Sequence, residues 1–377
     1  MGAVSCSKKT SLLVLAVMSI VVIIYYPPEL YGLVSNEDAG YDDISYLKKK
    51  ASKNHKVSSG TTKPNLPQDV IAGVEKFVFF IGYPRSGHSI IGSFLDAHPN
   101  IVIAHEFMLF RKWQHFNEKN TLTGHSKLQN KTYLFNALYH SSVHNSNSGW
   151  RSGSRDSKNY TLNVDSPWMG KYDRHVSVIG DKSGGTATTT YLESPENFTI
   201  YYKQLQETVG VPIKVLHGVR NPFDLVSTKA LYDVGRKTRN TTQEKFVSSF
   251  KADMSRLRNE EFMKARFDNE KALEKNLNQI NSLASAVTKL TDLIGPSNVL
   301  ELHNSDLVSD PNSTLTKICA FLEVDCSPDY FQACSRKVFN SVSKSRELVV
   351  WPKRLQSMVE DMIKSYPFFH RYSFTSE

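Results

Sequence analysis

The sequence is organised around the stretch Phe77-Val78-Phe79-Phe80-Ile81-Gly82-Tyr83-Pro84-Arg85-Ser86-Gly87-His88-Ser89. An apolar run leads into a turn with a glycine at each end, and a helical pattern follows. Glycines allow a tight turn, and the backbone N–H groups of such a turn can converge on an anion at the positive end of the next helix. The stretch therefore predicts a strand, a phosphate loop and a helix, with Ser86, His88 and Ser89 adding side-chain donors.

The cation of this loop lies in an unusual place. A nucleotide-triphosphatase loop reads G-x-x-x-x-G-K-[ST], whereas here His88 holds the lysine position and Arg85 lies inside the loop. This shift argues against ordinary ATP chemistry. A loop of the form G-x-P-[RK]-S-G-[TS]-[TS] resembles the 5′-phosphosulfate loop of sulfotransferases, which use 3′-phosphoadenosine 5′-phosphosulfate (PAPS). The resemblance implies that residues 85–89 bind the donor, with His88 standing where that family usually has threonine.

Composition sets broad limits on the fold and its ligands. With 377 residues, 40% of them hydrophobic, the chain can bury one sizeable core, and we expect one catalytic domain. The net charge of +9 fits nucleic acid, acidic glycans or anionic nucleotides equally well. No cysteine or histidine has zinc spacing, so no metal is expected. Cys319 sits in an apolar helical pattern, so the simplest disulfide joins Cys326 to Cys334.

The N-terminal segment predicts a membrane anchor. Lys8 and Lys9 precede an uncharged apolar run over 12–26, which ends at two prolines without a small-residue cleavage pattern. The run is shorter than the roughly 20 residues of a plasma-membrane span, and it suits a thinner early-secretory membrane. The positive flank predicts a cytosolic tail at 1–10, a transmembrane signal anchor at 11–27, and a single-pass type II protein of the Golgi membrane.

Beyond the anchor, residues 28–72 are polar and cannot bury enough surface to order themselves, so we expect a flexible stem before a lumenal domain at 73–377. Five N-x-[ST] sequons lie at Asn130, Asn159, Asn197, Asn240 and Asn312. Five sequons together with an anchor favour a glycosylated lumenal domain.

A second strand is predicted over 101–104, and it delivers His105 and Glu106 to the edge at which open α/β sheets bind ligands. The passage 82–106 looks like the same passage in tyrosylprotein sulfotransferases, including L-D-A-H-P and a glutamate seven residues after the proline. That glutamate is the family's general base, so the resemblance assigns this role to Glu106. Desolvation is expected to raise its pKa toward a useful range. His105 and His88 are the alternative bases.

The strand predicted over 176–180 leads into Asp181-Lys182-Ser183, so we expect Lys182 to emerge at the sheet edge. This element is similar to the acid-Lys-[ST] element of heparan-type sulfotransferases, in which the lysine contacts the transferring sulfuryl group. The resemblance implies that Lys182 and Arg85 are catalytic cations. A buried structural pair of Asp181 with Lys182 is the alternative.

The strand predicted over 211–219 runs into Arg220-Asn221-Pro222-Phe223-Asp224, with Thr228 eight places after the arginine and Ser227 one residue earlier. This resembles the family's 3′-phosphate motif. A guanidinium grips phosphate bidentately, and a helix-borne hydroxyl can donate beside it. Ser343-Lys344-Ser345-Arg346 lies where the family often places a basic nucleotide-binding loop.

Two further segments carry expectations. Residues 107–175 mix aromatics such as Trp113, Trp150 and Trp168 with cations, and predict an acceptor-binding insertion in which rings stack on sugars. A solvated region with a few packed aromatics is the alternative. Residues 241–293 predict helix, with one apolar stripe assigned to the core: Leu273, Leu277, Ile280, Leu283, Val287, Leu290 and Leu293.

Together these patterns predict an α/β fold with a mostly parallel central sheet and flanking helices, preceded by a single transmembrane helix. It resembles the P-loop-like sulfotransferase fold. The implied activity is sulfuryl transfer from PAPS to an acceptor hydroxyl, by in-line attack through a loose transition state. Glycan acceptors come first, then peptidyl tyrosine and small alcohols. Met108 replaces the arginine that tyrosylprotein sulfotransferases have there, which weighs against tyrosine.

Two other classes of function remain open. A catalytically inactive PAPS- or glycan-binding protein would account for His88 in the loop. A nucleotide kinase would need the missing lysine. A lumenal location argues against a nucleic-acid partner, and the sequence does not predict the oligomeric state.

Overall fold

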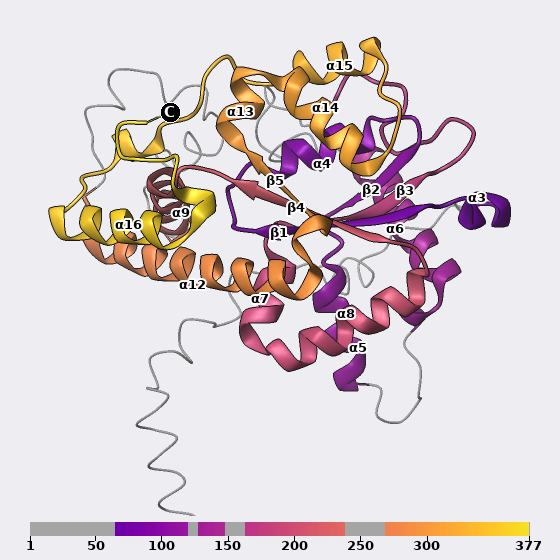
Figure 1. Ribbon diagram of the computed structural model, residues 1–377, viewed down its shortest axis with the longest axis horizontal. Helices are drawn as coiled ribbons and strands as arrows, with labels where there is room; N and C mark the ends of the chain where they lie inside the picture. The colour runs from indigo at the N-terminus through magenta and orange to yellow at the C-terminus, as the bar shows by residue number, and fades with distance from the viewer. Residues whose placement is uncertain (1–64, 120–126, 148–162, 238–267, 377) are drawn as a thin grey trace, which may run out of the picture. The chain divides into compact units, whose positions relative to one another are not determined.

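The computed structural model describes residues 65–119, 127–147, 163–237 and 268–376 (Figure 1). In chain order the elements are α3 (Gln68–Ala72), β1 (Lys76–Gly82), α4 (His88–Asp96), β2 (Ile101–His105), α5 (Leu109–Lys119), η2 (Lys127–Gln129), α6 (Lys131–Asn147), β3 (Val178–Lys182), α7 (Thr186–Glu193), α8 (Pro195–Val209), β4 (Ile213–Val219), α9 (Pro222–Lys237), α12 (Glu270–Ile294), η6 (Pro296–Asn298), β5 (Val299–His303), α13 (Asn304–Ser309), α14 (Pro311–Leu322), α15 (Pro328–Ser335), η7 (Ser345–Leu348), α16 (Lys353–Ser365) and η8 (Pro367–Phe369).

The sheet has the strand order β2-β3-β1-β4-β5, and every neighbouring pair is parallel. β1 lies at its centre, and all seven of its residues are buried. A run of apolar residues with no polar alternation is typical of a parallel strand covered on both faces. The predicted parallel α/β sheet is confirmed, and the four strands predicted above are present as β1 to β4.

Helices cover both faces of the sheet. Side chains alternate along β1, so Phe77 and Phe79 enter one core while Val78 and Phe80 enter the other. In Figure 1, α5, α7, α8 and α12 lie below the sheet, and α4, α14 and α15 lie above it. This layering leaves the carboxyl edge of the strands for the loops that follow them.

Two expectations about the helices need correction. Residues 65–72, inside the predicted stem 28–72, are part of the folded domain because Val70 and Ile71 of α3 are buried. Leu293 was predicted to face the core but is 40% exposed, and Ile294 is buried instead. In the last turn of α12 the inward position falls four residues after Leu290 rather than three. Residues 241–267 of the predicted helix lie outside the described residues.

The predicted disulfide between Cys326 and Cys334 is wrong. Cys319 pairs with Cys326, with 6.2 Å between their Cα atoms, and Cys334 is a buried free thiol. The reason is the end of α14, where Glu323 has a φ of 54° and the N–H of Val324 donates to the Cys319 carbonyl. This left-handed turn folds the chain back and brings Cys326 beside the last turn of the helix.

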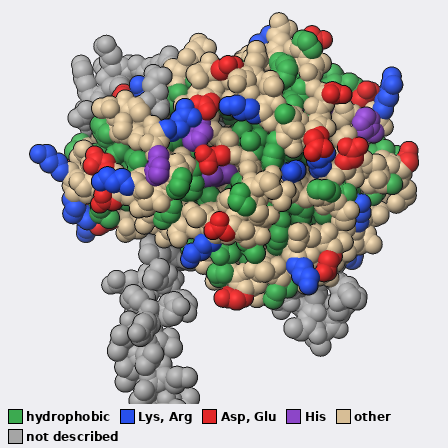
Figure 2. All heavy atoms as spheres, in the orientation of Figure 1, with side chains coloured by type: hydrophobic (Ala, Val, Ile, Leu, Met, Phe, Trp, Pro, Cys, Tyr) green, Lys and Arg blue, Asp and Glu red, His purple; other side chains and the backbone are tan. Residues whose placement is uncertain are grey.

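Among the described residues, no helix is long and apolar enough to cross a membrane. The predicted anchor at 11–27 lies outside them, as do Trp150 and the sequons at Asn159 and Asn240. The other three sequon asparagines are exposed: Asn130, Asn197 and Asn312. On the face drawn in Figure 2, basic and acidic side chains are interspersed over the described surface.

Candidate active site

The predicted phosphate loop lies between β1 and α4, so the predicted order of strand, loop and helix is confirmed. Gly82 has a φ of 128° and Gly87, the N-cap of α4, has a φ of 92°, which are conformations that favour glycine. Among the described residues no side chain caps α4, so its first backbone N–H groups face the loop without a capping acceptor from that part of the chain. Asn304, directly after β5, comes so close that a Cβ on Gly87 would lie 2.6 Å from its Nδ2. An uncapped helix N-terminus of this kind suits a phosphate or sulfonate.

His88 is buried between the loop and the end of β3. Its Nδ1 lies 3.2 Å from the Ser86 hydroxyl, and a Cβ on Gly184 would overlap its ring. Burial lowers the pKa of His88 to about 3, and the charge of Lys182 adds to this effect. The imidazole is therefore neutral at physiological pH. Gly184 is a residue that the sequence did not single out; its position after the Asp181-Lys182-Ser183 element is the only signal it gives.

Lys182 is the last residue of β3, and its side chain is completely buried rather than emerging at the sheet edge. Its ammonium group forms an ion pair with Glu106 and donates to the Ser89 hydroxyl at 3.0 Å. Gly92 of α4 provides room for the lysine stem, because a Cβ there would press against it. The ends of β2 and β3 and the start of α4 thus meet at one ammonium group. Asp181, the alternative partner, points to the opposite face of the strand.

Glu106 follows β2, and its side chain is 34% exposed while that of Lys182 is not exposed. Burial acts to raise the pKa of Glu106, but the charge of Lys182 and the hydrogen bond from Lys182 outweigh it and lower the pKa to about 2. The expectation that burial raises the pKa of Glu106 is therefore wrong. Lys182, at the end of the neighbouring strand β3, supplies the positive charge that lowers this pKa. The carboxylate is ionised at physiological pH and accessible from one side.

Arg85 does not join this ion pair. Its backbone has a φ of 72°, and its guanidinium lies 3.8 Å from the centre of the Tyr232 ring, in a cation–π contact. Tyr232 belongs to α9, the helix that follows β4. The structure thus places the Arg85 side chain against α9 rather than beside Glu106.

Arg220 is buried directly after β4, where the sequence predicted a phosphate ligand. Its Nη1 donates to the Arg85 carbonyl at 3.1 Å and its Nη2 donates to the Ser343 carbonyl at 2.9 Å. Its Nε has no hydrogen-bond partner within the described parts of the chain. Arg220 therefore ties the phosphate loop to the segment 343–346 and keeps one buried donor available.

The predicted hydroxyl residues lie next to the same segment. Thr228 Oγ1 and Ser345 Oγ are 2.7 Å apart, and Ser345 donates to the Asp224 carbonyl at 3.0 Å. The Ser227 hydroxyl is buried, again with no partner in the described ranges. Segment 343–346 is thus brought to Arg220 and Thr228, although more than a hundred residues separate it from them.

Arg346 of this segment has a structural role. Its guanidinium forms a fully buried ion pair with Asp224 and donates to the carbonyls of Phe374 and Ser376. These acceptors occupy the donors of Arg346, so the arginine holds the segment and the C-terminal residues in place. The predicted basic loop therefore contributes its backbone and Ser345 to the site rather than this charge.

These groups fit a nucleotide that carries anions at two ends. One end offers the uncapped start of α4 and the ammonium group of Lys182; the other offers the Nε of Arg220 and the hydroxyl of Ser227, which are buried donors without described partners. Buried donors are normally paired, so these two donors are available to a ligand. PAPS, with its phosphosulfate and its 3′-phosphate, has acceptors for both ends.

The predicted acceptor insertion at 107–175 is in part a scaffold. Trp113 is completely buried, and its Nε1 donates to Gln204 at 2.8 Å, so it cannot stack on a sugar. Asn145 of α6 donates to the His105 carbonyl at 2.8 Å and supports the end of β2. The packed alternative therefore holds for Trp113, and the insertion helps to hold the strand that carries Glu106.

The sequence is similar to one known family. A family model described as "Sulfotransferase family" matches residues 78–328, about two thirds of the chain. No curated protein matches the sequence.

The chain is also similar to solved structures. The sulfotransferase domain of the Synechococcus PCC 7002 olefin synthase is 13% identical, over 84% of this chain and 99% of that one, with a TM-score of 0.42. Mycobacterium avium sulfotransferase STF9 is 9% identical over 88% and 98%, with a TM-score of 0.39. Mouse sulfotransferase SULT7A1 complexed with PAP is 13% identical over 79% and 86%, with a TM-score of 0.35. At these values the family model alone supports an assignment.

Proposed function

The chain belongs to the sulfotransferase family, and from this premise we propose that it transfers a sulfuryl group from PAPS to a hydroxyl of a glycan. The observation that carries the proposal is the ion pair of Lys182 with Glu106 beside the uncapped start of α4. It puts an accessible carboxylate and a buried cation next to an anion-binding turn. Sulfuryl transfer needs a proton acceptor and a positive group at the reacting centre.

We assign the two ends of the site to the two ends of the donor. The loop residues Ser86 to Ser89 and Lys182 would hold the phosphosulfate, and Arg220 with Ser227 and Thr228 would hold the 3′-phosphate. PAPS supplies the sulfuryl group and a bisphosphate leaving group. Arg85 links the two ends, because its carbonyl accepts from Arg220 while its own side chain lies on α9.

In the proposed reaction Glu106 accepts the proton of the acceptor hydroxyl. Its exposed side faces the acceptor, and its low pKa keeps it unprotonated before the reaction. Lys182 stabilises the negative charge on the transferring oxygens, and its buried stem fixes where that charge must lie. His88 is neutral and adds no charge to the centre. The protein then acts mainly by positioning and by electrostatics.

The acceptor is proposed from the setting rather than from the fold. A glycan suits a glycosylated, lumenal enzyme, and Met108 at the position next but one to Glu106 leaves out the cation that a tyrosine-sulfating enzyme has there. Peptidyl tyrosine is the second candidate. An inactive PAPS-binding protein is the third, because His88 replaces a hydroxyl in the loop.

The activity test uses full-length protein in detergent with sulfur-labelled PAPS and panels of glycans, tyrosine peptides and small alcohols. We expect the labelled sulfur to be transferred to a glycan by the wild type and not by Glu106→Gln. Transfer to a tyrosine peptide alone would show that the acceptor is peptidyl tyrosine rather than a glycan. PAPS binding without any transfer would identify a catalytically inactive protein. Consumption of ATP would instead support the alternative that the protein is a nucleotide kinase.

We also propose that the protein is anchored in the Golgi membrane by residues 11–27, with the described domain in the lumen. The uncharged run, the two lysines before it and the three exposed sequons support this. The disulfide of Cys319 with Cys326 fits an oxidising compartment. Glycosidase treatment of protein from a secretory host should increase its electrophoretic mobility, and an unchanged mobility would overturn the lumenal assignment.

A further inference from the structure

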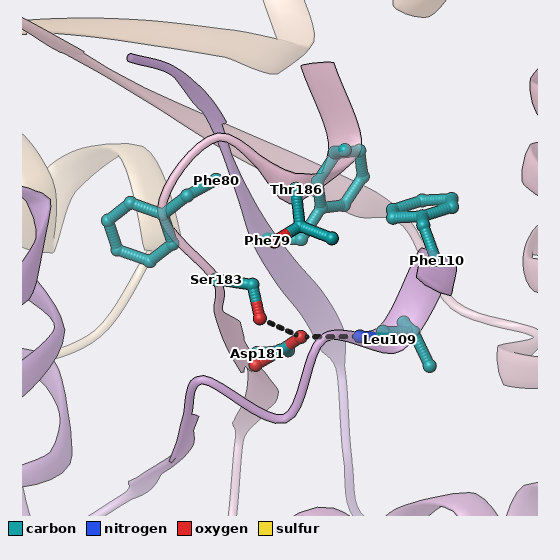
Figure 3. Close-up of a pocket in the computed structure, with 8 residues that line it drawn as sticks. Phe79, Phe80, Leu109, Phe110, Asp181, Ser183 and Thr186 are labelled. Carbon is teal, nitrogen blue, oxygen red and sulfur yellow. Dashed lines mark hydrogen bonds between the residues drawn. The ribbon is translucent and has the colours of Figure 1, made fainter. Parts of the chain in front are cut away.

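Asp181 is a buried carboxylate on β3, next to Lys182, and its side chain is occupied by backbone N–H groups. It is 2% exposed. Its Oδ1 accepts from the N–H of Phe107 at 3.0 Å, and its Oδ2 accepts from the N–H of Leu109 at 2.9 Å and from the Ser183 hydroxyl at 2.7 Å. Figure 3 shows Asp181 between Ser183 and Leu109, with both hydrogen bonds drawn.

The neighbours of Asp181 complete the same pattern. Ser183 Oγ accepts from the N–H of Met108 at 2.8 Å, and the Lys182 carbonyl accepts from the N–H of Glu106 at 2.7 Å. Four consecutive backbone donors, those of residues 106–109, therefore all bind residues 181–183. This is a complete clamp on the segment that begins with the proposed base.

The clamp holds a backbone conformation that the segment would not adopt by itself. Glu106 has a φ of 54° and Met108 a φ of 58°, and neither is a glycine. Left-handed backbone is uncommon for such residues and persists where surrounding contacts fix it. Release of the four N–H groups would let residues 106–108 move to ordinary backbone angles, and Glu106 would leave its place beside Lys182.

The surroundings of Asp181 offer few other hydrogen-bond acceptors to the backbone N–H groups that it binds. The cavity beside it has a volume of about 10 Å³, and Phe79, Phe80 and Phe110 form much of its wall (Figure 3). This is room for about one water molecule. Lys112 and Glu106 are the charged groups that act on the carboxylate from nearby elements. A carboxylate in such a site is retained for the hydrogen bonds it accepts.

We propose that Asp181 and Ser183 are positioning residues for sulfuryl transfer, which fix Glu106 against Lys182 through the backbone of 107–109. The proposal rests on the proposed function for its kinetic part only. It requires no contact of either residue with donor or acceptor.

The test compares Asp181→Asn, Ser183→Ala and Ser183→Thr in the full-length protein. Asp181→Asn should lower kcat by roughly 10- to 100-fold, the scale for a catalytic group displaced by about 1 Å, with the affinity for the nucleotide product unchanged. Ser183→Ala should lower kcat about tenfold on the same reasoning, and Ser183→Thr, which keeps the hydroxyl, should restore most of it. An unchanged kcat in Asp181→Asn and Ser183→Ala would overturn the proposal.

A matched control distinguishes positioning from general stability. Asp96 is also a buried carboxylate that accepts backbone N–H groups, from Ile103 at 2.7 Å and Gly170 at 2.9 Å, and these two donors belong to residues outside the clamped segment 106–109. Asp96→Asn should lower the melting temperature without changing kcat per folded molecule. If it lowers kcat as much as Asp181→Asn does, the effect is one of stability and the proposal fails.

Hydrogen exchange provides a readout that does not depend on activity. The amides of Phe107 and Leu109 should exchange faster in Asp181→Asn than in wild type, and those of Asp96→Asn should be unchanged at these two positions. If the wild type transfers no sulfuryl group, the proposed function fails, whereas the exchange result still tests the clamp. Unchanged exchange at 107 and 109 would overturn the clamp itself. Should Asp181→Asn not fold, Ser183→Ala and Ser183→Thr give the same contrast at Met108.

Discussion

The two ends of the proposed donor site are built in different ways. The transfer end, formed by Ser89, Glu106 and Lys182, brings two charged groups from the ends of β2 and β3 together with a hydroxyl from the start of α4. The 3′-phosphate end, formed by Arg220, Ser227, Thr228 and Ser345, is a buried frame of hydrogen bonds. At the transfer end a change in one side chain changes the protonation of another. At the 3′-phosphate end it removes a donor and leaves the remaining frame in place. Changes at the first end should therefore affect rate, and changes at the second should affect affinity.

The largest effect should come from the cation of the transfer end. Lys182→Met removes the charge while keeping most of the buried stem, and kcat should fall by roughly 10²- to 10³-fold, as for loss of a transition-state donor. The pKa of Glu106 should rise, since Lys182 supplies the main effect that lowers it. Single-turnover transfer measures the change. Lys76→Met is the control, because Lys76 is a buried lysine of β1 paired with Glu323; an equal loss there would remove the special role of Lys182.

The next effect concerns the carboxylate of the same pair. Glu106→Gln keeps the shape but cannot accept a proton, so kcat should fall by about 10²-fold with little change in PAPS affinity. Steady-state kinetics and calorimetry together measure this split. If Glu106→Gln keeps near-normal turnover while His88→Gln or His105→Gln abolishes it, the base has been misassigned.

The two ends also differ in how far they could be predicted from sequence. Arg220 and Thr228 lie within nine consecutive residues that run from a strand into a helix, so their spacing alone fixes where they meet. Glu106 and Lys182 were each predicted at a strand end, but their ion pair depends on β2 and β3 being neighbours with His105 opposite Lys182. No local spacing encodes that register, so the pKa of Glu106 was predicted in the wrong direction.

The same limit explains the other corrections. The clamp of residues 181–183 on 106–109 consists of contacts between segments more than seventy residues apart. The disulfide depends on the left-handed backbone of Glu323 at the end of α14. Because this residue is not a glycine, the turn has no signal in the sequence. Ser345 was placed near the nucleotide by resemblance, but the bond to Thr228 joins residues that only the folded chain brings together. Local motifs were predictable, and partners that come from distant segments were not.

The third effect sharpens the contrast by moving to the 3′-phosphate end. Arg220→Ala should weaken binding of the bisphosphate product by about 2 kcal/mol, roughly thirtyfold, as for a charge-assisted hydrogen bond in a shielded site. Turnover at saturating PAPS should change far less. Calorimetry measures the affinity, with Arg354→Ala as control because Arg354 pairs with Glu270 and Glu274 on the surface. Unchanged affinity in Arg220→Ala would remove this residue from the site.

The smallest effect is a pH dependence at the transfer end that arises from Asp181. Burial raises the pKa of Asp181 from 3.8 to about 6, although the hydrogen bonds from Leu109, Ser183 and Phe107 oppose this rise. Because the folded pKa lies above the unfolded value, the stability contributed by this group is fully present below about 3.8 and is lost as the pH rises through about 6. Turnover should respond in the opposite sense, since a protonated oxygen can no longer accept every N–H group of the clamp.

We therefore expect kcat to fall by about twofold at pH 6, where half of Asp181 is protonated, and further below it. Glu106 and His88, with pKa values of about 2 and 3, do not titrate in this range. The acid limb should be absent from the residual activity of Asp181→Asn and present in His105→Gln, which tests the neighbouring histidine. If the fall in kcat at acid pH persists in Asp181→Asn, another group causes it. If the fall disappears in this variant, the protonation of Asp181 controls turnover at the transfer end through the clamp.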